Sequence, residues 1–215
     1  MVLLMILEKV KQSSLIDLLA IITPFVIIMG LMHKIGIYTS EQVDASWFVS
    51  IFTPTDFMLS DLTIYLFFIT SLLYLDKAIF KPESSAIKEL LWANLQLSSG
   101  YVGVFFILWY RHKSFGDLTF YYFLIVLSLN GFGIIFLSKR IGKIFGLGLL
   151  LLVPYLSGKE YADQLLEEKL PIVELDDNKK WYLLDKHSDQ LILINNQAEK
   201  NEFKVVDMKE IKILK

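Results

Sequence analysis

Long apolar runs separated by short polar segments fill the first three quarters of the chain, and short apolar runs with polar joints fill the rest. A helix needs about 20 mostly apolar residues to cross roughly 30 Å of hydrocarbon. A fifth apolar run, Ile144–Ser157, has only 14 residues and predicts a short span, a re-entrant segment or an interfacial helix. Four longer runs predict membrane spans: Leu15–Ile35, Phe57–Leu75, Lys88–Tyr110 and Leu118–Ser138.

Residues at the ends of these runs fit helices that cross a bilayer. Pro24 predicts a kink in the first span, and Asp56 suits the N-cap of the second. Trp92 and Trp109-Tyr110 lie near the two ends of the third span, about 25 Å apart along a helix. Aromatic side chains at both ends are typical of interfacial belts, and packing in a core is the alternative reading.

The segment Tyr38–Thr55 between the first two spans mixes charged residues with apolar ones at helical spacing. One interpretation is a short amphipathic helix that lies on the outer membrane surface. The other is a lid packed on the helix bundle, which we favour.

The last 57 residues predict a small water-facing module. Lys159–Lys169 predicts a short amphipathic helix, which Pro171 stops. Turn-forming residues separate the later runs, so we expect an antiparallel meander that is closed or half-closed like a small SH3-type barrel. The predicted strands are Ile172–Leu175, Trp181–Asp185, Leu191–Asn195, Glu202–Asp207 and Ile211–Leu214, and the predicted joints are 176–178, 186–189 and 195–197.

The strand Leu191–Ile194 is apolar on both faces, and a module of this size has little core of its own. One face therefore needs a partner: another subunit, the membrane part or a second protein. We predict that Trp181, Leu191 and Leu193 dock such a partner.

Composition supports this division of the chain. Hydrophobic residues make up 54% of it and charged residues 20%, against about 45–50% and 25% in soluble domains. We therefore expect a polytopic α-helical membrane protein, with a transmembrane domain over residues 1–158 and a small C-terminal β-module over 159–215. The net charge of −2 gives no basic footprint for direct binding of nucleic acid.

Lysine and arginine in the short loops predict the orientation. With a cytoplasmic N-terminus, eight of them lie inside and three outside. The apolar prefix precedes the first charges, so we expect no cleavable signal peptide. We expect the protein in a bacterial inner membrane, with a short fifth run that does not cross and a C-terminal module in the cytoplasm. If that run does cross, the module is outside.

Residues for catalysis are scarce. The chain has no cysteine, and its three histidines, His33, His112 and His187, fall in different segments without ligand spacing. We expect them at interfaces or on the surface. Neither nucleotide-binding nor hydrolase motifs occur, so we predict a protein that is not an enzyme and uses neither a cofactor nor a metal.

Polar and small residues inside the spans carry more information, since lipid disfavours them unless they pair or face water. Gln96, Ser99, Gly100 and Gly103 share one face of the third span. Two readings stay open: these residues pack helices together, or they line an aqueous path. The set predicted to pack helices or line a pore is Asn94, Gln96, Ser98, Ser99, Gly100, Gly103, Asn130 and the pair Gly142 and Gly146.

In layout, the chain resembles the membrane subunit of the Kiwa anti-phage defence system. Its length, the four spans and the C-terminal polar module from Lys159 to Lys215 carry the resemblance. This resemblance implies a membrane sensor and scaffold that works with a cytosolic DNA-binding partner and has no catalysis of its own.

Two functions follow. The first is an oligomeric inner-membrane scaffold or sensor for antiviral defence, whose module docks a cytosolic protein. The second is a ligand-gated channel or pore-forming effector lined by Asn94, Gln96, Ser98 and Ser99. An enzyme with an unfamiliar site is a distant third.

Overall fold

The computed structural model describes residues 15–60, 62–79, 86–110, 116–137, 140–165, 169–175, 179–196, 200–210 and 213–214. It divides into two compact units. The helical unit comprises Met1–Ile22 and Leu62–Val153, and the sheet unit comprises Thr23–Asp61 and Pro154–Lys215. Each unit is thus built from two separate segments. This division differs from the single boundary at residue 158 that the sequence suggested.

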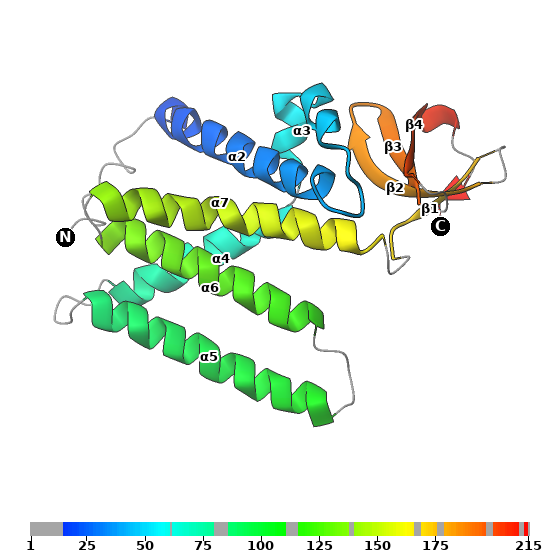
Figure 1. Cartoon of the computed structure of the whole chain (residues 1–215). Helices are drawn as coiled ribbons and strands as arrows, with labels where there is room; N and C mark the ends of the chain where they lie inside the picture. The colour runs from blue at the N-terminus through cyan, green and yellow to red at the C-terminus, as the bar shows by residue number, and fades with distance from the viewer. Residues whose placement is uncertain are drawn as a thin grey trace. The chain divides into compact units, whose positions relative to one another are not determined.

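Five long helices carry the apolar runs (Figure 1). Within the described residues, three helices are long and apolar enough to cross a membrane: α5 and α6, through Leu90–Ile107 and Leu118–Leu137, and α7. Shorter apolar stretches, Ile22–Tyr38 and Thr63–Leu73, lie in α2 and α4. The bounds are α2 Leu15–Tyr38, α4 Leu62–Ile79, α5 Ala86–Tyr110, α6 Gly116–Leu137 and α7 Arg140–Asp163.

Two predicted boundaries were wrong. The fifth apolar run is the middle of α7, whose 24 residues rise about 36 Å, enough to cross a bilayer. The same helix takes in Lys159–Asp163, so no separate helix begins there. The predicted second span begins too early, because Phe57 belongs to the short helix α3, Pro54–Met58.

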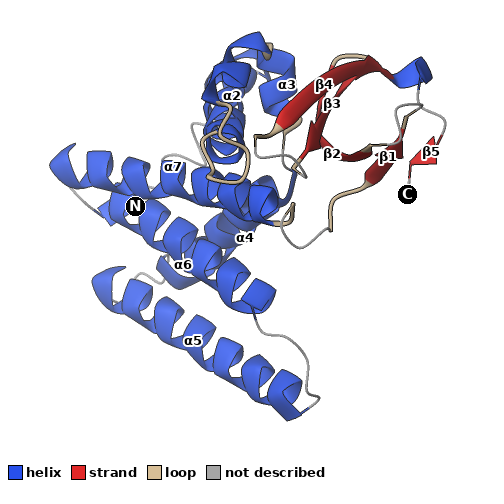
Figure 2. Ribbon diagram, turned by 45° about the vertical axis from the view of Figure 1, so that its right-hand side comes forward, coloured by secondary structure: helices blue, strands red, loops and turns tan. Residues whose placement is uncertain are grey.

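The helical unit is held together around α6. Ser128 of α6 hydrogen-bonds to Ser71 of α4, and both side chains are buried. The amides of Asn94 on α5 and Asn130 on α6 donate to each other's oxygens, at 3.2 and 2.9 Å. Each amide also donates to a carbonyl one turn back in its own helix. Polar pairs therefore join α6 to both neighbours, which Figure 2 shows beside it.

Glycine allows α6 and α7 to approach closely. A Cβ added to Gly146 would lie 2.7 Å from the Gly131 carbonyl oxygen. Gly146 of α7 therefore packs closely against Gly131 of α6. Gly142 is half-buried in the first turn of α7.

The sheet unit contains the predicted meander. Its antiparallel strands follow the order β4-β3-β2-β1-β5, with the two-residue β5 paired to β1. Four of the five predicted strands agree to within three residues at each end, whereas Ile211 and the joints 176–178 and 197 lie outside the described residues. Lys186 and His187 lie in β2, so the turn shortens to Ser188-Asp189. The bounds are β1 Ile172–Glu174, β2 Lys180–His187, β3 Gln190–Asn195, β4 Glu202–Asp207 and β5 Ile213–Leu214.

One hydrophobic core unites the two segments of the sheet unit. The segment after α2 contributes Val43, Ala45, Phe48 and Phe52, each at most 7% exposed. They pack in the cluster that holds the inward-facing residues of β2 and β3. The other members are Ile37, Tyr38, Ala162, Leu165, Leu170, Tyr182, Leu184, Ile192 and Ile194.

This core corrects the prediction for Tyr38–Thr55. The segment forms the 3-10 helix Ser46–Ile51, which buries Phe48 in the core it shares with the sheet. It is therefore a lid that packs on the sheet and on the C-terminal ends of α2 and α7, which contribute Ile37, Tyr38 and Ala162 to the same core. An outside location for this segment and a cytoplasmic location for the module cannot both hold, because one hydrophobic core cannot lie on two sides of a membrane.

Candidate functional site

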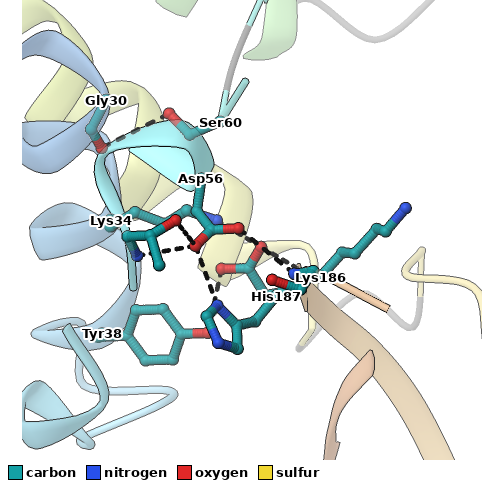
Figure 3. A network of polar contacts seen from close by, with 10 residues as sticks. Gly30, Lys34, Tyr38, Asp56, Ser60, Lys186 and His187 are labelled. Atoms are coloured by element: carbon teal, nitrogen blue, oxygen red, sulfur yellow. Dashed lines mark hydrogen bonds and ion pairs between the residues drawn. The ribbon is translucent and has the colours of Figure 1, made fainter. Parts of the chain in front are cut away.

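A cluster of charged residues of the sheet unit lies where α2, α3 and the β2–β3 hairpin come together (Figure 3). Two carboxylates organise this cluster. Asp185 lies near the end of β2, and Asp56 lies in α3. Each carboxylate collects donors from segments that are far apart in the sequence.

Asp185 forms a buried ion pair with Lys34 of α2, and their side chains are 11% and 4% exposed. Its second oxygen accepts a hydrogen bond from the Tyr38 hydroxyl at 3.0 Å. The Lys34 ammonium also lies 4.6 Å from the centre of the Phe52 ring, a cation–π distance. Lys34 therefore has a negative charge and an aromatic face to balance its burial.

A register shift in β2 between Leu183 and Asp185 accompanies this contact. In a regular strand, Asp185 would share a face with Leu183, opposite to Leu184. An extra residue in one strand redirects the side chains that follow it. Leu184 and Tyr38 belong to the same core. The shift thus explains how Asp185 lies on the face of Leu184 and accepts the hydrogen bond from Tyr38.

Asp56 joins the hairpin to α3. One of its oxygens accepts bonds from the Thr53 backbone N–H, the Thr53 hydroxyl and His187 Nδ1, at 2.7, 2.6 and 2.9 Å. The other accepts the backbone N–H of Ser188 at 3.4 Å, which a left-handed φ of 52° at Ser188 accompanies. Thr53 is the N-cap of α3 and Asp56 closes its capping box, so the N-cap role predicted for Asp56 was wrong.

Burial of the Asp56 carboxylate opposes its ionisation, but the hydrogen bonds from Thr53, His187 and Ser188 outweigh that effect. Together they lower the pKa of Asp56 from 3.8 to about 2. Asp56 is therefore ionised at neutral pH. Because an ionised carboxylate only accepts hydrogen bonds, Nδ1 of His187 carries the proton that they share.

A pocket of about 410 Å³ opens beside these groups, within the size range of small-molecule sites. Its charges balance, with two lysines and two aspartates. The Thr53 hydroxyl donates to Asp56 and the Ser60 hydroxyl to the Gly30 carbonyl. The lining residues are Lys34, Thr53, Thr55, Asp56, Leu59, Ser60, Asp185, Lys186 and Ser188.

Sequence reasoning missed this cluster. His187 was expected on the surface, but it is 21% exposed and bonded to Asp56. His33 was expected at an interface and is 4% exposed in the folded chain. His112 lies outside the described residues. The one available signal was Lys34, a charged residue in an apolar helix.

The predicted docking residues Trp181, Leu191 and Leu193 are 4%, 4% and 0% exposed. They form a second, smaller core with Val173 and Val206. Side chains of this same chain thus cover both apolar faces of β3. A docking role for these three residues stays an untested prediction.

The predicted set on α5 divides in two. Asn94 and Ser98 face α6, where Ser98 contacts the Tyr122 hydroxyl at 2.8 Å. The stripe of Gln96, Ser99, Gly100 and Gly103 is exposed, and a Cβ at either glycine would meet nothing within 4 Å. Asn94 and Ser98 therefore pack against α6, whereas the stripe lies on the surface of the chain.

Among the described residues, no three histidine or acidic side chains gather as they would around a metal ion. Comparison with models of known families, with curated proteins and with solved structures finds no match to this chain.

Proposed function

We propose that this membrane protein is a non-enzymatic sensor and scaffold whose sheet unit recognises a ligand or a partner protein. The observation that carries the proposal is the pocket built from three parts of the chain. Lys34 belongs to α2, Asp56 to the segment just before α4, and Asp185 to the hairpin. Binding there would act directly on two apolar helices.

The polar network favours this role over a purely structural one. A salt bridge that is taken out of water costs desolvation energy, and apolar residues of similar size often stabilise as well or better. A chain that needed only a stable module would gain little from Lys34 and Asp185. Fixed charges such as Lys34 and Asp185 at the wall of a pocket are suited to binding a polar ligand.

We propose further that the protein is a homo-oligomer that associates through the exposed α5 stripe. Small residues let helices approach closely in lipid, and Gln96 can hydrogen-bond across such a contact. The layout shared with the Kiwa membrane subunit is consistent with a sensor in antiviral defence, and this assignment is also a proposal.

The test is the native mass of the complex, purified from its host in lipid nanodiscs. We expect a homo-oligomer with a stoichiometric partner or ligand bound to the wild-type protein. Lys186→Glu, at the pocket wall, should reduce that occupancy at least tenfold. Lys209→Glu makes the same charge change at an exposed lysine that does not line the pocket and should leave it unchanged. Equal occupancy in both variants, or a bare oligomer, would contradict the proposal.

The exposed stripe also favours a second candidate, a channel. Because Asn94 and Ser98 are engaged with α6, the pore lining reduces to Gln96 and Ser99. Flux of ions into liposomes should then fall when Gln96 or Ser99 is changed to Leu. The matched change of Ser98 to Ala should leave that flux unchanged. A flux that is insensitive to Gln96→Leu and Ser99→Leu rejects this lining.

A further inference from the structure

The sheet unit carries information about how the chain crosses the membrane. Its core combines side chains from residues 39–61, which follow α2, with side chains from the C-terminal sheet. Hydrogen bonds reinforce the connection, since Asn201 Nδ2 donates to the carbonyls of Gln42 and Val43 at 2.7 and 3.1 Å. Separating these segments would expose several apolar side chains, each costing roughly 1.5–3 kcal/mol. Both segments therefore lie on the same side of the membrane.

Four helices, α4 to α7, lie between these two segments in the chain. To return to the same side, the chain must cross the membrane an even number of times between them. Three of the four, α5, α6 and α7, are long and apolar enough to cross. Three crossings alone would put the two halves of one core on opposite sides of the bilayer. With α5, α6 and α7 all crossing, the even count requires α4 as the fourth crossing.

The length of α4 allows this. Its 18 residues rise about 27 Å, close to the thickness of a thin hydrocarbon core. Its charged residues, Asp76 and Lys77, come near its C-terminal end, so the stretch before them is free of charge. The apolar α2, with 24 residues, then brings the chain from the N-terminus to the side of the sheet unit.

Basic residues identify that side. The segments opposite to the sheet unit hold Lys81 between α4 and α5, Lys139 between α6 and α7 with Arg140 at the start of α7, and Lys9 and Lys11 before α2. Between α5 and α6, on the side of the sheet unit, lie only Arg111 and Lys113. Short cytoplasmic segments are the ones enriched in Lys and Arg.

We propose that the chain crosses the membrane five times with a cytoplasmic N-terminus, and that the β-sheet, with residues 39–61 and the pocket, faces the outside. Its ligand is then a polar molecule or protein met outside the cell membrane. A cytosolic partner would bind the opposite end of the chain. The inference rests on the membrane integration in the proposed function, but it does not depend on what the pocket binds.

Because the chain contains no cysteine, single cysteines can be placed without background. We would label intact spheroplasts with a membrane-impermeant maleimide after Glu41→Cys, Lys113→Cys, Gln190→Cys or Ser84→Cys. Glu41 and Gln190 are exposed in the two segments of the sheet unit. Position 84 falls between α4 and α5 in the sequence. Labelling in detergent gives the total accessible thiol of each variant and shows that the variant is made.

We expect positions 41, 113 and 190 to be labelled from outside, and position 84 only after permeabilisation. Opposite behaviour of positions 41 and 190 would overturn the shared side. External labelling of position 84 together with 41 and 190 would overturn the α4 crossing. Protection of 41, 113 and 190 with labelling of 84 would overturn the outward orientation. Loss of pocket occupancy in Lys186→Glu changes none of these patterns, so this inference and the proposed function fail separately.

Discussion

The two units of this protein use polar groups in opposite ways. In the helical unit, large apolar side chains such as Leu95, Phe106 and Ile107 are more than half exposed, as lipid contact allows. Small polar pairs such as Ser71 with Ser128 lie buried between helices. In the sheet unit, apolar side chains fill the interior and a charged cluster lies at its edge. This is the difference expected if the helical unit contacts lipid and the sheet unit water, because lipid provides no hydrophobic force between helices, whereas water does.

The largest effect should come from breaking the buried ion pair of the sheet unit. Asp185→Ala leaves Lys34 buried without its carboxylate, at a cost of about 3–5 kcal/mol. Hydrogen exchange in nanodiscs should then show lost protection in β2 and β3, and unchanged protection in α5 and α6. Replacing both partners, Lys34→Met with Asp185→Leu, should restore most of the protection. A double variant as unstable as Asp185→Ala would contradict this account.

A smaller loss is expected where α2 and α7 touch within the sheet unit. A Cβ on Gly36 would lie 2.1 Å from the Tyr155 carbonyl oxygen, and one on Gly158 would lie 2.1 Å from that of His33. Gly36→Ala should therefore cost about 1–3 kcal/mol, because backbone must move. Gly148→Ala in α7 is the control, since nothing lies within 4 Å of its Cβ. Thermal unfolding in nanodiscs measures both, and equal melting temperatures would refute the close contact.

Much of the fold was predictable because its signals are local. A run of about 20 mostly apolar residues identifies α6, and short runs separated by turn-forming residues identify β2 to β4. The site was not predictable, since Lys34 and Asp185 are 151 residues apart and share no local pattern. The end of α7 was misread because its charges, from Lys159 onward, resemble the start of a new helix. The shared core of the sheet unit was missed for the same reason as the site.

Acid should weaken the sheet unit through Asp56. Its pKa is lowered to about 2, below its ordinary value of 3.8, so its stabilisation is complete above pH 3.8 and is lost as the pH falls through about 2. The shift corresponds to about 2 kcal/mol. Asp56→Asn should be less stable than wild type at neutral pH and lose less stability between pH 4 and pH 2. Circular dichroism of the sheet in detergent measures the stability of both proteins against pH. If the two curves of stability against pH are parallel, Asp56 does not stabilise the sheet unit in this way.

The smallest effect is expected for the polar pair between α5 and α6 in the helical unit. Asn94 and Asn130 exchange hydrogen bonds between α5 and α6, and a single interhelical bond in a membrane is worth about 1 kcal/mol or less. A double-mutant cycle with Asn94→Ala and Asn130→Ala should therefore give a coupling near that value. The coupling stays small because each amide keeps its bond to its own helix. The matched cycle of Lys34→Met and Asp185→Leu should couple several times more strongly. Equal coupling in the two cycles would mean that lipid and water do not set the strength of these polar pairs.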